Sequence, residues 1–166
     1  VKIFKGKFFP DERGYFKKPF SGDNLESDFQ NISEVLVSKS KKNVIRGIHF
    51  QTPPWDVSKL VSCIDGVVKD VFIDLRKDSP TYGTFDYVYL DNVDNFSVII
   101  PEGFGHGFSV LSESATVVYL QSGAYNDNHD SGINSLDLEI DWEVENPILS
   151  EKDKSLISFS EFQSPW

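Results

Sequence analysis

Short runs of apolar and β-branched residues, separated by turn sequences, recur along the whole chain. Runs of this length with little helical periodicity are typical of β-strands. We predict strands at 35–37, 44–50, 59–64, 67–75, 84–90, 97–100, 107–110 and 115–120. The turn sequences between them predict antiparallel pairing, with Asp65-Gly66 as the clearest hairpin turn.

The segment 69–75 alternates in a way that separates its side chains into two sets. One face of the predicted strand carries Val71, Ile73 and Leu75, and the other carries Asp70, Phe72 and Asp74. Such a pattern is typical of a barrel or jelly roll with a lined interior. Because the chain has no internal repeat, low-complexity tract or linker, we predict one mainly β jelly-roll domain over residues 1–166.

The segment after Pro147 differs from the rest because it carries helix signals. Ser150 has the side chain of an N-cap, and Asp153 stands at the third helical position. We therefore expect short peripheral helices around the barrel. An N-terminal strand and a C-terminal helical segment are expected to pack on it.

Composition and charge narrow the class of protein. The chain has 166 residues, of which 39% are hydrophobic, enough for one buried core. Its formal net charge of -10 argues against nucleic acid as a partner, because phosphates are bound by basic surfaces. Cys63 lies among apolar neighbours and is expected to be a buried structural thiol. Without an apolar run of membrane-spanning length, we expect a soluble cytoplasmic protein that does not bind membranes.

A base and a cation lie close together in the stretch Arg46-Gly47-Ile48-His49-Phe50-Gln51 and the following Lys59. A neutral imidazole can accept a proton near pH 7. A nearby ammonium can carry the negative charge that forms on an enolate oxygen. These residues therefore favour proton abstraction beside a carbonyl group.

Further motifs follow these residues in a characteristic order. They are 59–61, 71–76, 79–83, 100–108 and 149–153, and together with 46–51 they resemble the dTDP-4-dehydrorhamnose 3,5-epimerase family. The resemblance implies a cupin-type jelly roll that forms a homodimer and uses no metal or organic cofactor. It also implies an isomerase that inverts C3, C5 or both of a nucleotide-linked 4-keto-6-deoxy sugar, for surface polysaccharide or deoxysugar biosynthesis.

The resemblance assigns the proton-transfer residues one by one. His49 matches the base, and Asp153 matches the carboxylate that orients it. Lys59 matches the lysine that stabilises the enolate. Tyr119 matches the acid that returns a proton from the opposite face of the sugar, and His106 matches a histidine that contacts substrate in the same cavity.

The remaining assignments concern substrate binding. By resemblance, nucleotide and phosphate contacts come from Arg46 and Arg13, and the segment that carries Arg13 can serve the cavity of the partner subunit. Further substrate-binding positions implied by the resemblance are Tyr125 at the rim of the site, Asp130 and Lys152, which help to line it, and Gln51.

The chain departs from the family pattern at positions in the walls around the nucleotide and the sugar. The departures are Lys18, Glu34, Leu36, Val37, Leu120, Ala124 and the segment 132–135. They leave open whether the substrate is dTDP- or GDP-linked, whether its sugar is a hexose or a heptose, and whether C3 alone or both carbons are inverted.

Three other functions compete with epimerisation. A metal-dependent cupin is disfavoured because the chain has three histidines and no His-x-His motif. A 3,4-ketoisomerase on the same scaffold would use related enolisation chemistry. A non-catalytic sugar-nucleotide-binding cupin is also possible on this fold, but would not need an acid and a base on opposing sides of one cavity.

Overall fold

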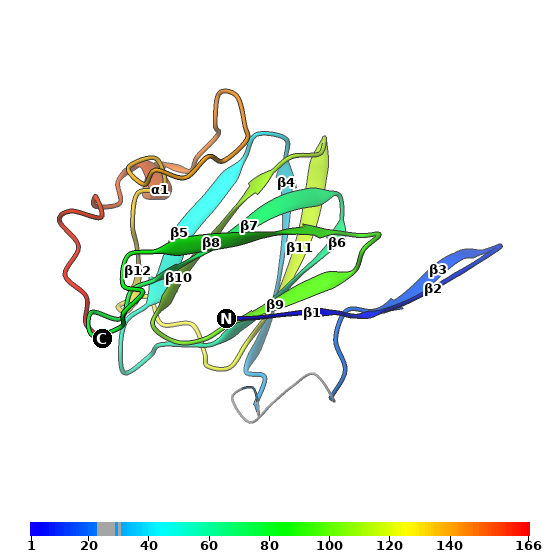
Figure 1. Ribbon diagram of the computed structural model, residues 1–166, viewed down its shortest axis with the longest axis horizontal. Helices are drawn as coiled ribbons and strands as arrows, with labels where there is room; N and C mark the ends of the chain where they lie inside the picture. Colours follow the sequence, from blue (N-terminus) through cyan, green and yellow to red (C-terminus); the bar gives the residue numbers. More distant parts are fainter. Residues whose placement is uncertain (23–28, 30) are drawn as a thin grey trace.

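Two antiparallel sheets face each other across a buried apolar layer (Figure 1). The computed structural model describes residues 1–22, 29 and 31–166. In this part of the chain, the first sheet has the order β1 (Lys2–Lys5), β9 (Phe96–Ile100), β6 (Lys59–Asp65), β11 (Ser114–Gln121), β4 (Glu34–Lys41). The second sheet has the order β12 (Asp130–Gly132), β5 (Ile45–Gln51), β10 (Phe104–Val110), β7 (Val67–Asp74), β8 (Phe85–Asp91). This arrangement confirms the predicted mainly β jelly roll.

The predicted hairpin at Asp65-Gly66 is wrong. β6 ends at Asp65 and belongs to the first sheet, whereas β7 begins at Val67 and belongs to the second. The turn, with Gly66 at a φ of 81°, therefore carries the chain across from one sheet to the other. A turn sequence specifies a reversal of the chain but not the strand that will pair, and burial of both strands in one core decides the crossing.

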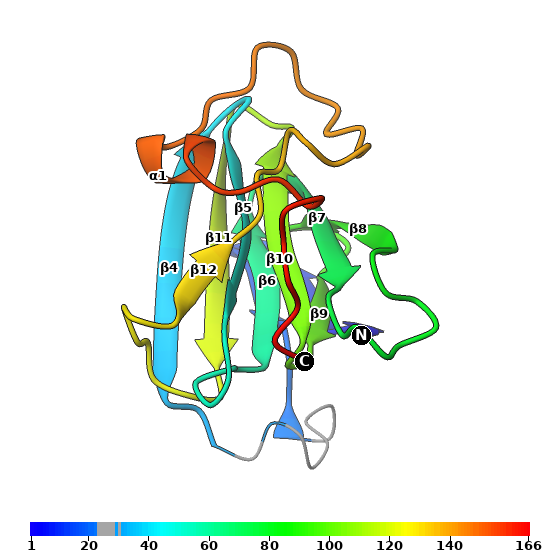
Figure 2. The same cartoon turned by 90° about the vertical axis from the view of Figure 1, so that its left-hand side faces the viewer.

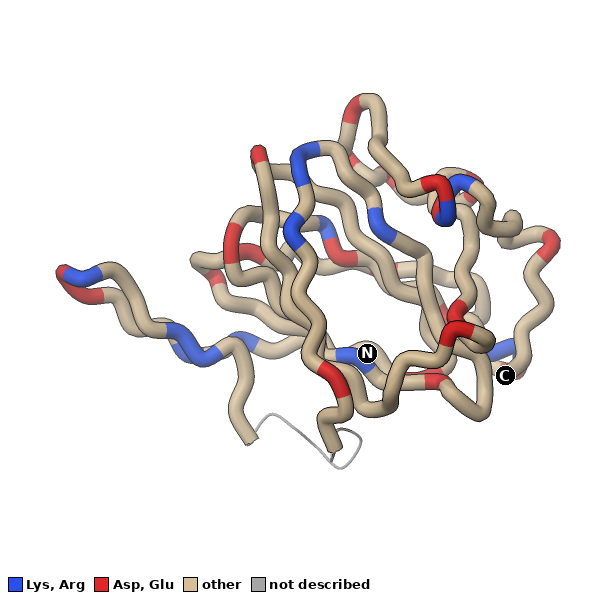
Figure 3. Tube along the Cα trace, turned by 180° about the vertical axis from the view of Figure 1, so that it is seen from behind, with Lys and Arg blue, Asp and Glu red and all other residues tan. Residues whose placement is uncertain are grey.

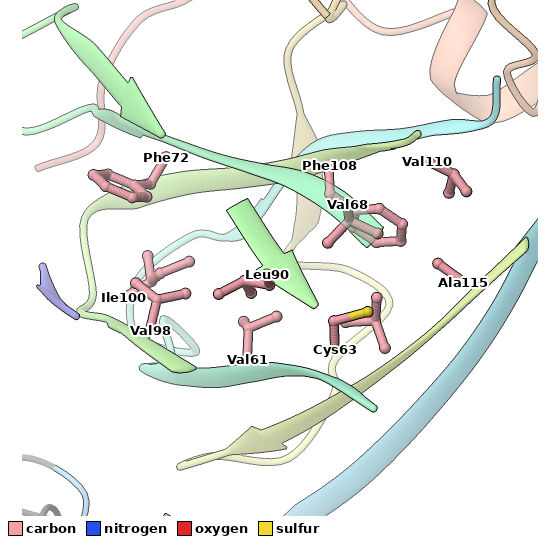
Figure 4. Close-up of a cluster of buried hydrophobic side chains, with 11 residues drawn as sticks. Val61, Cys63, Val68, Phe72, Leu90, Val98, Ile100, Phe108, Val110 and Ala115 are labelled. Carbon is pink, nitrogen blue, oxygen red and sulfur yellow. The ribbon is translucent and has the colours of Figure 1, made fainter. Parts of the chain in front are cut away.

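The core lies between the two sheets (Figure 4). Val61 and Val98 project into it from the first sheet, and Val68 and Phe108 project from the second. Cys63 also lies in this core, where removal from water raises the pKa of its thiol to about 11. This confirms the expected buried thiol.

The alternation predicted for 69–75 is confirmed, but both faces of the strand are buried. Phe72 packs in the core between the sheets. Val71, Ile73 and Leu75 pack on the outer face of the second sheet, against Ile140 and other residues of the C-terminal segment. Figure 2 shows that segment, in orange and red, crossing over β5 and β10. The carboxylates that alternate with these apolar positions, Asp70 and Asp74, are therefore buried.

The predicted strand regions all carry strands, and the structure adds N-terminal strands that the pattern did not delimit. β2 (Lys7–Asp11) and β3 (Gly14–Lys18) pair as a hairpin. This hairpin projects away from the two sheets (Figure 1), and its tip carries acidic and basic positions (Figure 3).

The predicted helix start is also confirmed. The helix α1 (Glu151–Lys154) is capped by Ser150, whose hydroxyl accepts a hydrogen bond from the backbone N–H of Asp153. Among the described residues, no helix has the length and apolar character needed to cross a membrane.

Candidate active site

A cavity of about 230 Å³ opens between the two sheets. Both sheets contribute to its walls, because β4, β6 and β11 lie in the first sheet and β5 and β10 in the second. Its lining residues are Leu36, Ser38, Arg46, His49, Lys59, His106, Phe108, Tyr119 and Gln121. Mouths of β-barrels are common sites for small ligands.

Two histidines face the cavity from neighbouring strands. His49 on β5 and His106 on β10 are direct partners in the strand register, and β5 bulges just before His49, where two of its residues lie opposite Gly107. The strands approach closely at Gly47, where an added Cβ would lie 2.6 Å from the Cα of Gly107. Gly47 also has a φ of 113°, which other residues rarely adopt. The close approach and the backbone conformation therefore explain why the Arg-Gly-Ile-His motif has a glycine at this position.

His49 is held by a carboxylate from the C-terminal segment. Its Nε2 lies 2.6 Å from Oδ1 of Asp153. Burial raises the pKa of the Asp153 carboxyl, but hydrogen bonding to His49 and the charge of that ring outweigh this and lower it overall. Because Asp153 engages Nε2, Nδ1 of His49 is the ring nitrogen left for a ligand.

A second histidine–aspartate pair lies deeper in the jelly roll. Nε2 of His106 lies 2.9 Å from Oδ2 of Asp70, and both side chains are buried. Asp70 comes from β7, beside β10. From the alternation alone, Asp70 was predicted to share a strand face with Phe72 and Asp74, and no role was assigned to it. A carboxylate in a long strand of mostly apolar residues was the available signal.

Lys59 and Tyr119 lie on the first sheet, across the cavity from His49. Removal from water lowers the pKa of Lys59 to about 8, although the charges of Asp130 and Asp70 oppose this. The hydroxyl of Tyr119 lies 3.3 Å from that of Ser38, and its ring packs against His106 and Phe108. Burial raises the pKa of the Tyr119 phenol, which favours its protonated form.

The rim residues form a connected group outside the cavity lining. The hydroxyl of Tyr125 donates to Oδ2 of Asp130 at 2.8 Å, and Lys152 donates to the same oxygen. Gln51 is the register partner of Asp130 but uses its amide to hold a loop: it donates to the carbonyl of Trp55 and accepts from the N–H of Asn126.

The two predicted phosphate-binding arginines occupy different places. Arg46 lines the cavity, where its Nε donates to Ser40 at 2.8 Å. Arg13 lies at the tip of the β2–β3 hairpin, with its side chain 85% exposed and paired to Asp11. The structure therefore does not bring Arg13 to the cavity of its own chain.

Sequence reasoning missed some of the cavity wall. Ser38 and Gln121 were not singled out, and only their positions on strands that face the cavity reveal them. Within the described residues, no three histidine, cysteine or acidic side chains gather in a way that could hold a metal ion.

Comparison with known proteins identifies the family of this chain. The family model of dTDP-4-dehydrorhamnose 3,5-epimerase matches residues 1–161. The chain belongs to this family. A dTDP-4-dehydrorhamnose 3,5-epimerase from Shigella flexneri is 42% identical over 158 residues, covering 92% of this chain and 87% of its own.

Two further proteins are similar to this epimerase: one is named as a 3-epimerase, and the other is a 3,5-epimerase with a solved structure. A dTDP-4-dehydrorhamnose 3-epimerase from Streptomyces niveus is 41% identical over 156 residues, covering 91% of this chain and 75% of its own. A crystal structure from Legionella pneumophila, in complex with dTDP-4-keto-L-rhamnose, has a TM-score of 0.89 and 34% identity, covering 97% of this chain and 88% of that one. The comparisons confirm the predicted family, the isomerase class and the epimerisation of nucleotide-linked deoxysugars.

Proposed function

We propose that this epimerase acts on a dTDP-linked 4-keto-6-deoxy sugar and inverts C3, C5 or both. The observation that supports this most is the placement of His49 and Tyr119 on opposite sheets around one cavity. Inversion requires that a proton leave one face of the sugar ring and return to the other. An imidazole and a phenol on opposing walls meet that requirement.

The first step is removal of the proton beside the carbonyl. Its C–H bond breaks, the proton passes to Nδ1 of His49, and the electron pair moves to the carbonyl oxygen at C4. Without help this transfer is uphill by roughly a dozen pKa units, on the order of 16 kcal/mol. The ammonium of Lys59 offsets part of this by stabilising the enolate oxygen.

The second step returns a proton to the other face. Tyr119 donates its phenolic proton to the carbon, and the electron pair returns from the oxygen to form the new C–H bond. Burial keeps the pKa of this phenol raised, so the proton is present before turnover begins. The phenolate then regains a proton from solvent, and His49 loses the proton that it took.

Charged and aromatic groups near the cavity suit the nucleotide part of the substrate. Arg46 offers a guanidinium at the cavity wall, and Lys152 offers an ammonium at the rim. Tyr125 is exposed and can contact the base, with Asp130 holding its hydroxyl. Gln51 contributes by holding the rim loop.

The same proposal includes a homodimer in which Arg13 binds substrate in the partner's cavity. The β2–β3 hairpin projects from the two sheets (Figure 1). It exposes Phe9, Tyr15 and Phe16. Exposed aromatic residues on a projecting hairpin suit contact with a second copy. If Arg13 acts across the dimer, mixing refolded His49→Asn and Arg13→Ala subunits restores activity, because each mixed dimer has one complete site. Absence of recovery in verified mixed dimers would refute this part.

Proton NMR in D2O tests the central proposal. We expect the protein to place deuterium at C3, C5 or both of a dTDP-linked 4-keto-6-deoxyhexose, with formation of the epimer. A matched GDP-linked sugar and a heptose derivative report the preference for base and sugar. Movement of the carbonyl to C3 would instead identify a ketoisomerase.

Histidine variants provide the matched controls for this experiment. His49→Asn is expected to abolish exchange, whereas His129→Asn should retain it. His129 lies in a loop where it contacts Thr52 and Trp55 and does not line the cavity. Undiminished exchange in folded His49→Asn protein would refute the assignment of His49 as the base.

A further inference from the structure

Asp70 has a feature that a simple structural carboxylate would not need. Its side chain is fully buried, and only Oδ2 is engaged by His106. Its other oxygen, Oδ1, has no hydrogen-bond partner among the described residues. Burying a carboxylate oxygen without a donor is costly, so such a group is usually kept for a reason beyond packing.

Asp70 does not line the cavity itself but contacts His106, which does. Asp70 is the register partner of Phe108 of β10 and lies on β7 two positions from Phe72, the register partner of His106. Because Asp70 engages Nε2, the ring nitrogen of His106 left to face the cavity is Nδ1. A carboxylate that fixes one nitrogen of a histidine fixes both the ring orientation and which nitrogen carries the proton.

Asp70 also acts on the cation of the site. Burial raises the pKa of the Asp70 carboxyl overall, although the charge and hydrogen bond of His106 and the charge of Lys59 favour its ionised form. In return, the charge of Asp70 is one of two that support the protonated form of Lys59, the other being that of Asp130. The remaining ionisable groups around this lysine are the cavity residues His49, His106, Arg46 and Tyr119.

The two histidine–aspartate pairs differ in their access to solvent. The side chain of His49 is 32% exposed, whereas that of His106 is 5% exposed. A base must exchange its proton with solvent between turnovers, which suits His49. A ring enclosed beside a carboxylate is better suited to holding a fixed orientation towards the ligand.

We propose that Asp70 is a positioning residue for epimerisation, which fixes the His106 ring with Nδ1 towards the cavity and serves as a buried counter-charge for the Lys59 ammonium. The inference rests on the proposed function, because it concerns stabilisation of the enolate. It assigns Asp70 no contact with substrate. Its effect reaches the reacting atoms only through His106 and Lys59.

The first test needs no substrate and uses ring ¹⁵N shifts of the three histidines. In the unmodified protein, Nε2 of His106 is expected to carry a proton. In Asp70→Asn, the shifts of His106 should change to a different tautomer or a mixture, while those of His129 stay the same. An unprotonated Nε2 in the unmodified protein would overturn the proposal, even if Asp70→Asn does not fold.

The second test measures the pH dependence of turnover. Asp70→Asn is expected to lower kcat by about 10- to 100-fold, with a smaller change in KM, because the enolate charge develops only after binding. The loss of kcat at high pH should also begin at a lower pH than in the unmodified protein. A folded Asp70→Asn protein with an unchanged pH profile would overturn the role as counter-charge.

Asp74→Asn is the matched control, since it makes the same change in a buried carboxylate on the same strand. Asp74 bonds Arg76, Ser79 and Thr81 and does not line the cavity. Its variant should keep the kcat and pH profile of the unmodified protein. If the unmodified protein shows no exchange on any substrate, the proposed function fails, while the histidine shifts still decide the placement of Asp70.

Discussion

The imidazole of His49 and the carboxylate of Asp153 lie 2.6 Å apart although 104 positions separate them in the chain. His49 belongs to a strand of the second sheet, and Asp153 belongs to a short helix that follows the last strand. The C-terminal segment therefore completes the site, because it carries the group that orients the base. This relationship makes the activity sensitive to changes far from the cavity lining.

Asp153→Asn should reduce kcat by roughly 10²- to 10³-fold, because the amide no longer favours the correct ring orientation and charge of His49. Steady-state rates of epimer formation check this. Ser150→Ala is the matched control, because it removes the cap of the same helix but leaves the carboxylate. We expect it to cost about 1 kcal/mol of stability and little kcat per folded molecule. Equal losses in both variants would mean that Asp153 acts only by holding the helix.

Tyr119→Phe should separate exchange from inversion. The variant keeps the ring that packs on His106 and Phe108 but lacks the proton donor. His49 can still remove a proton and return one to the same face, so we expect deuterium exchange with retained configuration. Formation of the epimer should fall by about 10²-fold or more.

NMR in D2O measures both quantities in one sample. Ser38→Ala removes the neighbouring hydroxyl and should retain most inversion. Inversion at the normal rate in Tyr119→Phe would show that another group donates the proton.

The turnover rate should decline as the pH rises through about 8, where Lys59 loses its charge. The sign follows from its role: the ammonium stabilises the enolate, and the neutral amine cannot. Lys59→Gln should lower kcat by roughly 10²- to 10³-fold at pH 7 and remove this decline. Rates measured between pH 6 and pH 9.5 provide the test. Lys42→Gln, a change in an exposed lysine paired with Glu113, should leave the profile as it is.

Asp74 should contribute to stability rather than to activity. Burial raises the pKa of its carboxyl, but hydrogen bonds from Arg76, Ser79 and Thr81 outweigh this and hold the pKa below its ordinary range. The stabilisation is therefore present above about pH 4 and is lost as the pH falls below that value. Asp74→Asn should lower the free energy of unfolding by about 2 kcal/mol at pH 7.

Urea unfolding at several pH values measures this effect. The difference between Asp74→Asn and the unmodified protein should shrink as the pH falls. Asp78→Asn, a change in an exposed carboxylate nearby, should have little effect. A constant difference at every pH would contradict the assigned charge state of Asp74.

The strand positions could be predicted because they depend on local patterns. Alternation in 69–75 correctly separated Phe72 from Val71 and Ile73, and the cap at Ser150 correctly marked the start of α1. Pairing between strands could not be predicted in the same way. Asp65-Gly66 has the sequence of a hairpin turn, but the strands on its two sides join different sheets.

The chain by itself determined the residue types of the site and their order, including the histidine, lysine and tyrosine that the family pattern assigns to proton transfer. Only the tertiary structure decided which of them meet. It placed His49 and Tyr119 on opposing walls, enclosed Asp70 behind His106 and left Arg13 at the tip of an exposed hairpin. The physical reason is that burial of apolar faces selects how the sheets stack, and that stacking brings together side chains with no local relationship in sequence.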